Sequence, residues 1–193
     1  MYPLEALREL IANALIHQDL SVTGAGPMIE VFASRLEVSN PGVPLIDIDR
    51  LLDEPPRTRN ERVARLMRQM RFCEERGSGI DRVVGLAEIF QLPAPDFAIR
   101  GQSFVATLLT PRSFAEMSLD ERARACYQHA CLRWVAGRNT TTNATLRERF
   151  GLPASRAAQI TKVLKEAVER RALRDADPKN RSRAQSAYLP YWA

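Results

Sequence analysis

The sequence predicts an α+β protein with two domains, residues 1–112 and 113–193. The first observation is length, because 193 residues with 45% hydrophobic side chains suffice for two small cores. The second is the alternating run from Ser103 to Leu109, which predicts a closing strand and is followed by Pro111. The third is charge: residues 1–112 hold 13 basic and 15 acidic side chains, whereas residues 113–193 hold 15 and 8. The positive excess of the chain therefore lies in the second domain.

The overall composition excludes several classes of protein. No stretch approaches the roughly 18 uninterrupted apolar residues of a membrane span, and the average apolar content argues against a disordered chain. The N-terminal Met-Tyr-Pro-Leu-Glu-Ala lacks the basic and apolar regions of a secretory signal, and three cysteines are too few for a disulfide scaffold. We therefore expect a cytoplasmic protein that does not enter a membrane.

The first expected helix, residues 4–16, carries two polar side chains on a largely apolar surface. Glu9 and Asn13 lie four residues apart and therefore on one helix face, and Asn13 is the only polar residue between Leu10 and Ile16. Burying such groups without partners costs roughly a few kcal/mol, so they need polar contacts. A metal ion with a phosphate ligand would supply these contacts. Water or backbone groups at the helix edge would do so equally well.

Four further segments complete the first domain. Residues 28–38 predict two strands joined by a turn, and Asn40-Pro41-Gly42 interrupts the second strand. A basic amphipathic helix is expected over residues 60–76, and another helix over residues 80–90. Between them, Gly77-Ser78-Gly79 stands at a helix start, where backbone N–H groups can close on an anion. The first of these glycines is equally suited to end the preceding helix.

The motifs of this domain, taken in order, carry a resemblance to a known family. Glu9-Leu-Ile-Ala-Asn13-Ala is similar to the N-box of the GHKL ATPases, the class of gyrase, histidine kinases and MutL. The whole set resembles the degenerate GHKL-like domain at the C-terminal end of RecG-related proteins, which are described as ATP-dependent DNA helicases or transcriptional regulators. Its motifs are here Tyr2-Pro3, Arg8-Glu9, Asn13-Ala14, His17-Gln18-Asp19, Asn40-Pro41-Gly42, Arg59-Asn60 and Gly77-Ser78-Gly79-Ile80. The resemblance covers about residues 1–110 and implies a GHKL-like α/β sandwich.

The resemblance also implies roles for individual residues. Glu9 would orient the attacking water, and Asn13 would bind a Mg²⁺ ion that bridges the phosphates of ATP. Asn40 would lie where the ATPases have the aspartate that contacts the adenine amino group, with Gly42 in the loop that follows. Gly77 and Gly79 would lie beneath the phosphates. The implied cofactors are ATP and Mg²⁺, and the residues by themselves establish none.

The chain departs from the ATPase pattern at three points. Asn40 replaces the aspartate, Pro44 stands where a second glycine is expected, and a helix precedes Gly77 in place of a long glycine-rich lid. Hydrolysis needs positioned water, a metal and a closed site together, so we expect that catalysis is lost. No P-loop motif occurs and no lysine precedes Lys162, so no helicase motor is expected.

The second domain is expected to contain three helices and a hairpin. The helices are predicted over residues 119–135, 143–150 and 155–171, and a tight turn between the last two makes a helix-turn-helix. Residues 173–176 and 187–189 form the strands of the hairpin, whose tip is polar and basic. Three helices followed by a basic-tipped hairpin resemble a winged helix-turn-helix domain.

A winged helix would bind double-stranded DNA through two surfaces. The third helix would enter the major groove with its first turns, and the hairpin would meet phosphates or the minor groove. Arg156 and Gln159 are the side chains that can contact base edges. The other expected contacts are Ser155, Lys162, Lys179, Arg181 and Arg183. The positive charge of this domain favours DNA as the partner, although winged helices also serve in protein interactions.

Cys126, His129 and Cys131 suggest a metal site, but the geometry of a helix argues against it. With 3.6 residues per turn, Cys131 is rotated by about 140° from Cys126, so one ion cannot easily reach both. We expect these side chains to pack in the core.

Together these features predict a DNA-binding transcriptional regulator whose degenerate nucleotide-binding domain serves ligand sensing or assembly. Two alternatives stay open: a RecG-related protein that binds ATP and hydrolyses it weakly through Glu9, and a module for protein interactions. Winged-helix regulators commonly act as dimers on paired half-sites, so a homodimer is considered. Members of the family usually carry a Schlafen AlbA-type domain upstream. This chain begins inside the first motif of the family, as a fragment or a shortened paralogue would.

Overall fold

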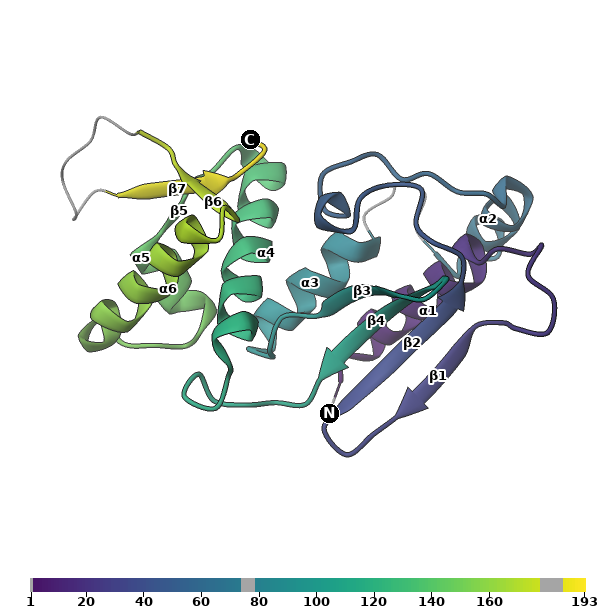
Figure 1. Cartoon of the computed structure of the whole chain (residues 1–193), viewed down its shortest axis with the longest axis horizontal. Helices are drawn as coiled ribbons and strands as arrows, with labels where there is room; N and C mark the ends of the chain where they lie inside the picture. Colours follow the sequence, from purple (N-terminus) through teal and green to yellow (C-terminus); the bar gives the residue numbers. More distant parts are fainter. Residues whose placement is uncertain (1, 74–78, 178–185) are drawn as a thin grey trace. The chain divides into compact units, whose positions relative to one another are not determined.

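A computed structural model describes residues 2–73, 79–177 and 186–193 of the chain (Figure 1). It contains helices and antiparallel sheets, so the prediction of an α+β protein is confirmed. The residues form two compact units: Met1–Ala87 with Pro95–Thr110, and Glu88–Ala94 with Pro111–Ala193. None of the helices in these ranges is long and apolar enough to span a membrane. Four of the predicted site residues, Gly77, Lys179, Arg181 and Arg183, lie outside the described residues.

The first unit is built on one four-stranded antiparallel sheet. Its strands are β1 (Met28–Val31), β2 (Arg35–Pro41), β3 (Asp96–Arg100) and β4 (Ser103–Leu109), in the order β1-β2-β4-β3 (Figure 1). The two strands expected in residues 28–38 and the strand expected at Ser103 are confirmed. Strand β3, which occupies the edge opposite β1, was not predicted from the sequence.

The helices of the first unit agree with prediction except at one end. They are α1 (Leu4–His17), α2 (Glu61–Gln69) and α3 (Gly79–Ile89), with a short 3-10 helix, η1 (Ile48–Arg50). The expectation that α2 continues to residue 76 is wrong, because the helix ends at Gln69. Arg71 adopts a left-handed conformation with φ 59°, and the N–H of Phe72 bonds to the carbonyl of Met67 at 2.9 Å. This geometry ends many helices and usually involves a glycine, but here the left-handed residue is Arg71.

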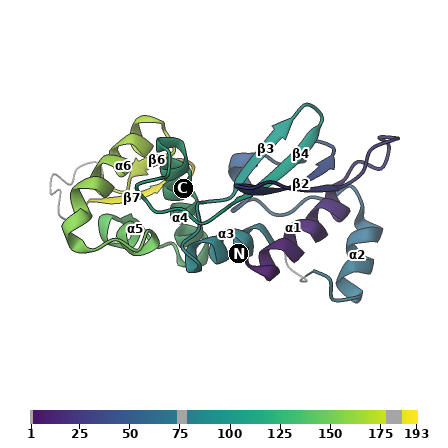
Figure 2. The ribbon, with the colours of Figure 1, turned by 90° about the horizontal axis from the view of Figure 1, so that it is seen from below.

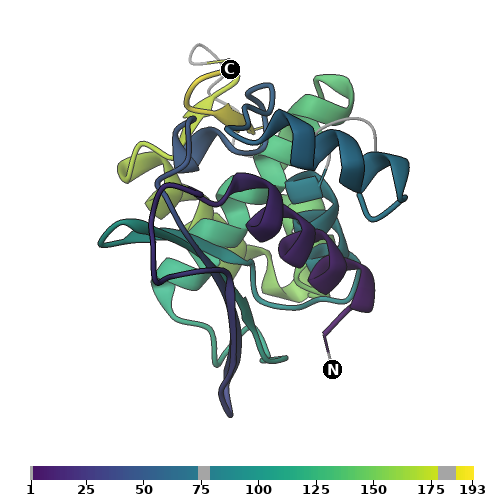
Figure 3. The same cartoon turned by 90° about the vertical axis from the view of Figure 1, so that its right-hand side faces the viewer.

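The helices cover one face of the sheet and enclose the first core. Figure 2 shows α1 and α3 beneath the strands, and Figure 3 shows α2 beside α1. The core consists of Ala6, Leu10, Ala14, Leu36, Val38, Val83, Ala106 and Leu108. Val38 lies directly opposite Ala106 in the β2–β4 pair, so the middle of the sheet faces the apolar stripe of α1. The amphipathic α1 is therefore held by burial of that stripe.

The second unit combines three helices with a small sheet. Its elements are α4 (Leu119–Gly137), β5 (Thr141–Thr142), α5 (Asn143–Arg149), η2 (Ala154–Arg156), α6 (Ala157–Glu169), β6 (Leu173–Asp175) and β7 (Ala187–Pro190). The strands are antiparallel in the order β5-β7-β6. The three expected helices and both expected hairpin strands are present. The third helix was expected from about Ser155; residues 154–156 form the separate 3-10 turn η2, and the α-helix begins at Ala157. Pro153 just before this turn explains the tighter start.

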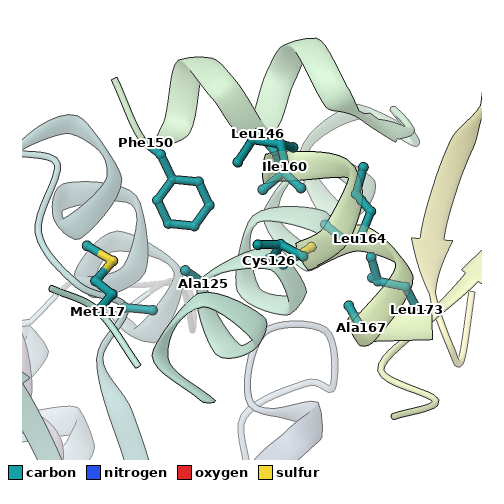
Figure 4. Close-up of a cluster of buried hydrophobic side chains, with 12 residues drawn as sticks. Met117, Ala125, Cys126, Leu146, Phe150, Ile160, Leu164, Ala167 and Leu173 are labelled. Atoms are coloured by element: carbon teal, nitrogen blue, oxygen red, sulfur yellow. The ribbon is translucent and has the colours of Figure 1, made fainter. Parts of the chain in front are cut away.

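Buried apolar side chains from all three helices form the second core (Figure 4). Ile160, Leu164 and Ala167 of α6 pack against Cys126 of α4 and Leu146 of α5. Cys126 and Cys131 are both fully buried, which confirms the expectation of core packing for the two thiols. Within the described residues no group of three potential ligands could hold a metal ion.

A buried polar cluster joins the segment Glu88–Ala94 to this core. Nδ1 of His129 lies 3.1 Å from each carboxylate oxygen of Glu88, and Nε of Arg149 lies 3.4 Å from Oε1 of Glu88. Arg149 also donates from Nη2 to the carbonyl oxygen of Leu92 at 2.8 Å. Since a carboxylate only accepts hydrogen bonds, Nδ1 of His129 is the donor in this contact. The end of α3 is therefore attached to α4 and α5 by charge as well as by packing.

Candidate functional site

The first unit contains a cavity of about 220 Å³. It lies between α1, the end of β2 with the loop after it, the segment Pro56–Arg59, α2 and the first residues of α3. Apolar side chains of the sheet, including Val38, Phe104 and Ala106, line it together with polar groups from the loops. A partly apolar concave site with a few converging polar groups is the usual form of a small-molecule pocket.

One end of the cavity is formed by Glu9, Asn13 and Gly79. Glu9 and Asn13 project from the same face of α1, where Glu9 is only 2% exposed and Asn13 is half-buried. A Cβ atom at residue 79 would lie 3.1 Å from Oε2 of Glu9 and 3.2 Å from Nδ2 of Asn13. A larger residue at position 79 would therefore require Glu9 or Asn13 to shift by a few tenths of an ångström. The N-terminal end of a helix favours negative charge, so this end of the cavity suits an anion.

Another part of the cavity wall contains Asn40 and Gly42, where β2 leaves the sheet. Asn40 is buried, and its Nδ2 donates to the carbonyl oxygen of Pro41 at 3.1 Å. Gly42 has φ +102°, and a Cβ atom there would lie 2.9 Å from Cβ of Asp19. The backbone N–H of Asp19 donates to the carbonyl of Pro41 at 2.8 Å, which holds the two loops together. Residue 42 must therefore be glycine for both conformation and space.

Five of the six residues expected to bind a cofactor line this one cavity: Glu9, Asn13, Asn40, Gly42 and Gly79. They come from separate segments of the chain, and the fold brings them together. The sixth, Gly77, lies outside the described residues. Their roles toward a ligand stay predictions.

Three arginines that sequence reasoning did not select, Arg57, Arg59 and Arg68, also line the cavity; we call them the arginine rim. The segment that carries the first two is tied to neighbouring backbone. Nδ2 of Asn60 donates to the carbonyls of Ile16 at 2.9 Å and Gln18 at 2.7 Å, at the end of α1. The Arg59-Asn60 motif was the available signal, but it did not reveal that the arginine faces a cavity.

Two titratable side chains of the cavity wall are held in their neutral forms. Burial lowers the pKa of His17, opposed by a hydrogen bond to the backbone of Arg57, and the charge of Arg59 lowers it further. Burial raises the pKa of the Cys73 thiol, and the charges of Arg68 and Glu9 have smaller and opposite effects. At neutral pH the imidazole is therefore uncharged and the thiol protonated, so neither is an activated nucleophile.

In the second unit, the expected DNA contacts that the structure describes are all exposed. Ser155 and Arg156 lie in η2, and Gln159 and Lys162 follow on the first turns of α6. Arg156, Gln159 and Lys162 border a shallow groove whose other side includes Phe114 and Arg122. The side chains that sequence reasoning grouped by spacing thus share one surface.

Comparison with known proteins adds two findings. Residues 24–108 match the family described as "Putative ATP-dependent DNA helicase recG C-terminal". This supports the predicted resemblance to RecG-related proteins for that part of the first unit, while Glu9 and Asn13 lie outside the matched range. The comparison with curated proteins found no match.

Among solved structures, the chain is similar to the DIP2311 protein from Corynebacterium diphtheriae. The two share 19% identity with a TM-score of 0.55, over 98% of this chain and 40% of that one. The similarity concerns the fold, and this chain spans less than half of the length of that protein.

Proposed function

We propose that the first unit binds a nucleotide, ATP with Mg²⁺, in the cavity beside α1, and that binding serves sensing rather than turnover. The observation that carries the proposal is the convergence of Glu9, Asn13, Asn40, Gly42 and Gly79 on one cavity. These residues were selected by motif, and the motifs are far apart in the sequence. The five residues belong to three motifs, which the fold brings to one cavity.

The chemistry of the cavity fits such a ligand. Asn13 and Glu9 offer the oxygen atoms that Mg²⁺ prefers, and Mg²⁺ is usually held by one or two side chains together with phosphates. The arginine rim adds positive charge to the cavity wall, which favours an anionic ligand. Because Nδ2 of Asn40 is engaged by Pro41, its Oδ1 is the group left to accept a hydrogen bond from an amino group such as that of adenine. The cavity is smaller than the usual range of about 300–1,000 Å³, so part of a nucleotide would extend beyond it.

Thermal stabilisation by ligand tests this proposal. Mg-ATP should raise the melting temperature of the first unit, and Asn13→Ala should abolish the rise. Gly79→Ala should weaken it, because the added methyl group displaces Glu9 or Asn13. Gly85→Ala is the matched control in the same helix, since a Cβ atom there meets nothing within 4 Å. A flat titration at millimolar ATP would refute the proposal.

The competing enzyme hypothesis assigns weak ATP hydrolysis to Glu9. Phosphate release that depends on Mg²⁺ and disappears in Glu9→Gln, while the thermal shift persists, would favour the enzyme over the sensor. No phosphate release together with a retained thermal shift would favour the sensor.

We further propose that the second unit is a winged helix that binds double-stranded DNA, which would make the protein a ligand-sensing transcriptional regulator. The order α4-β5-α5-α6-β6-β7, with β7 between β5 and β6, supports this assignment. The exposed Arg156, Gln159 and Lys162 at the start of α6 are where such domains meet the major groove. The second domain predicted from the sequence carries 15 of the 28 basic residues and 8 of the 23 acidic ones.

Salt-dependent binding to duplex DNA tests the second proposal. Affinity should fall steeply with salt, because phosphate contacts release counterions. Removing Arg156 and Lys162 together should weaken binding by roughly tenfold or more. Lys165→Ala should have less effect, because this residue lies beyond the first turns of α6 and pairs with Glu169 at 3.6 Å. Binding that is independent of salt, or absent, would favour a protein-interaction module instead.

A further inference from the structure

Strand β1 forms an unusually apolar and exposed edge of the first sheet. It pairs with β2 alone among the described strands and lies at the outer edge in Figure 1. Met28, Ile29 and Val31 are 52%, 48% and 74% exposed, and Glu30 is the only charged residue of the strand. Edge strands of monomeric proteins are normally protected by shortness, charges, proline or a covering segment; β1 is short, but it carries one charge against three exposed apolar side chains. This edge therefore has the character of an interface.

The hydrogen-bond ladder shows which backbone groups of β1 are directed outward. The N–H of Phe32 donates to the carbonyl of Arg35 at 2.9 Å, which makes these two residues a hydrogen-bonded pair. Bonding alternates along an antiparallel ladder, so Glu30 and Met28 also bond toward β2. The N–H and C=O groups of Ile29 and Val31 consequently point away from β2. Pro27, the next outward position, offers a carbonyl but no N–H.

Two antiparallel registers would let this edge pair with an identical edge across a two-fold axis. In one, Ile29 faces Ile29 of the second copy and Val31 faces Pro27. In the other, Glu30 is the centre and Ile29 faces Val31. Each register forms four backbone hydrogen bonds. In the register centred on Ile29, this number already takes into account that Pro27 has no N–H to donate.

Charge selects the first register. Pairing about Glu30 sets two carboxylates directly opposite each other, at the closest spacing of an antiparallel ladder. Pairing about Ile29 sets each Glu30 opposite Met28 of the second copy instead. Only this register avoids a like-charge pair while it uses every outward N–H of the strand.

Pairing about Ile29 also continues the apolar face of the sheet. Ile29 and Val31 lie opposite Val38 and Leu36 of β2, whose side chains belong to the first core. Directly opposite residues share one face of a sheet, so Ile29 and Val31 lie on the same face as that core and remain exposed at the edge. In the pair, Ile29 would be covered by its own counterpart and Val31 by Pro27.

We propose that a second copy of this chain docks on β1, antiparallel and centred on Ile29, so that the two four-stranded sheets become one continuous sheet. This interface is independent of the proposed ligand and DNA functions. It is self-complementary, because each copy supplies the same donors and acceptors, and such a closed contact gives a dimer rather than a fibre.

Sedimentation velocity of the whole chain over a wide range of concentration tests the proposal, with a reversible dimer as the expected result. Ile29→Pro removes an outward N–H without removing a bond to β2, and should lower the association constant by roughly tenfold or more. Ile99→Arg, on the exposed part of the opposite edge strand β3, should leave the dimer intact. A monomer at all concentrations would overturn the proposal.

A charge substitution at Met28 tests the register and does not depend on the tolerance of β1 for proline. Met28→Glu would face Glu30 of the second copy and weaken the dimer, whereas Met28→Lys would face the same carboxylate and preserve or strengthen it. Circular dichroism would verify that each variant keeps the native fold. A dimer that responds to neither Met28→Glu nor Ile29→Pro would place the interface elsewhere and refute this assignment.

Discussion

The buried charge pair of the second unit allows a quantitative prediction from one substitution, Glu88→Gln. Glutamine keeps the size of the side chain and can still accept the hydrogen bond from Nδ1 of His129. What it removes is the negative charge beside Arg149, whose side chain is only 1% exposed. Burial lowers the pKa of Arg149, and the charge of Glu88 opposes that effect. The substitution therefore isolates the contribution of one countercharge.

The magnitude follows from distance and exposure. At an effective dielectric constant of about 20, unit charges 3.4 Å apart attract by about 5 kcal/mol. The Glu88 side chain is 20% exposed, and water that enters the variant would solvate part of the arginine charge. Removing one partner of a buried pair typically costs about 3–5 kcal/mol, and we expect about 3 kcal/mol here. For a unit of this size, that corresponds to a fall in Tm of roughly 12–24 °C.

Tryptophan fluorescence during urea unfolding measures this effect in the second unit alone. The chain has two tryptophans, Trp134 and Trp192, and both belong to that unit. Glu88→Gln should shift the transition to lower urea with an unchanged m-value. Arg149→Met should cost less, about 1–2 kcal/mol, because it leaves a partly exposed carboxylate and one unbonded carbonyl at Leu92.

The double variant Glu88→Gln/Arg149→Met provides the decisive comparison. If the uncompensated arginine is the cause, the double variant should be more stable than Glu88→Gln alone by at least about 1 kcal/mol. A Glu88→Gln variant within about 0.5 kcal/mol of the parent, or a double variant no better than the single, would refute the electrostatic reasoning.

Three further predictions concern single residues. Burial raises the pKa of Asp81 to about 6, so the folded state binds its proton more tightly and stability should fall as the pH rises from about 4 to about 6. Asp81→Asn should remove this fall and raise the free energy of unfolding by about 1–2 kcal/mol at pH 7, after allowance for partial solvent screening. Calorimetry between pH 4 and 7 measures both effects, and a parent protein whose stability does not fall over this range would contradict the prediction. Both Gly42 and Gly101 have positive φ angles, +102° and +62°, but only a Cβ atom at residue 42 would make a close contact, 2.9 Å to Asp19. Gly42→Ala should therefore cost roughly 1–3 kcal/mol more than Gly101→Ala, and equal melting temperatures would contradict this. Ser118→Ala removes the capping box of α4 and should cost about 1 kcal/mol in tryptophan-detected unfolding, and an unchanged midpoint would argue against the cap.

Much of the secondary structure was predictable because local rules decide it. The apolar period of α1 and the alternation in β4 are properties of consecutive residues. Thr142 caps α5 in a capping box with Thr145, three residues later in the chain. The end of α2 was not predictable, because Arg71 adopts a left-handed conformation that is uncommon for arginine.

The candidate site was predictable in part. Glu9, Asn13, Asn40, Gly42 and Gly79 each stand in a recognisable motif, so their selection required no knowledge of the fold. The arginine rim was not found, because arginine is abundant on all surfaces and only position distinguishes those that face a cavity. The same is true of Glu88, whose partners His129 and Arg149 are 41 and 61 positions later in the chain.

The sequence by itself therefore determined most of the helices and strands, where the positive charge lies, and several of the residues that are chemically suited to a phosphate-bearing ligand. These depend on periodicity, composition and short motifs, which act within a few residues. The tertiary structure alone decided that α3 begins beside Glu9 and Asn13 and ends within the second unit, and that β1 is left as an exposed apolar edge. Such features arise from contacts between segments that are distant in the sequence. Burial and strand pairing each depend on two elements, so the sequence of one element does not reveal them.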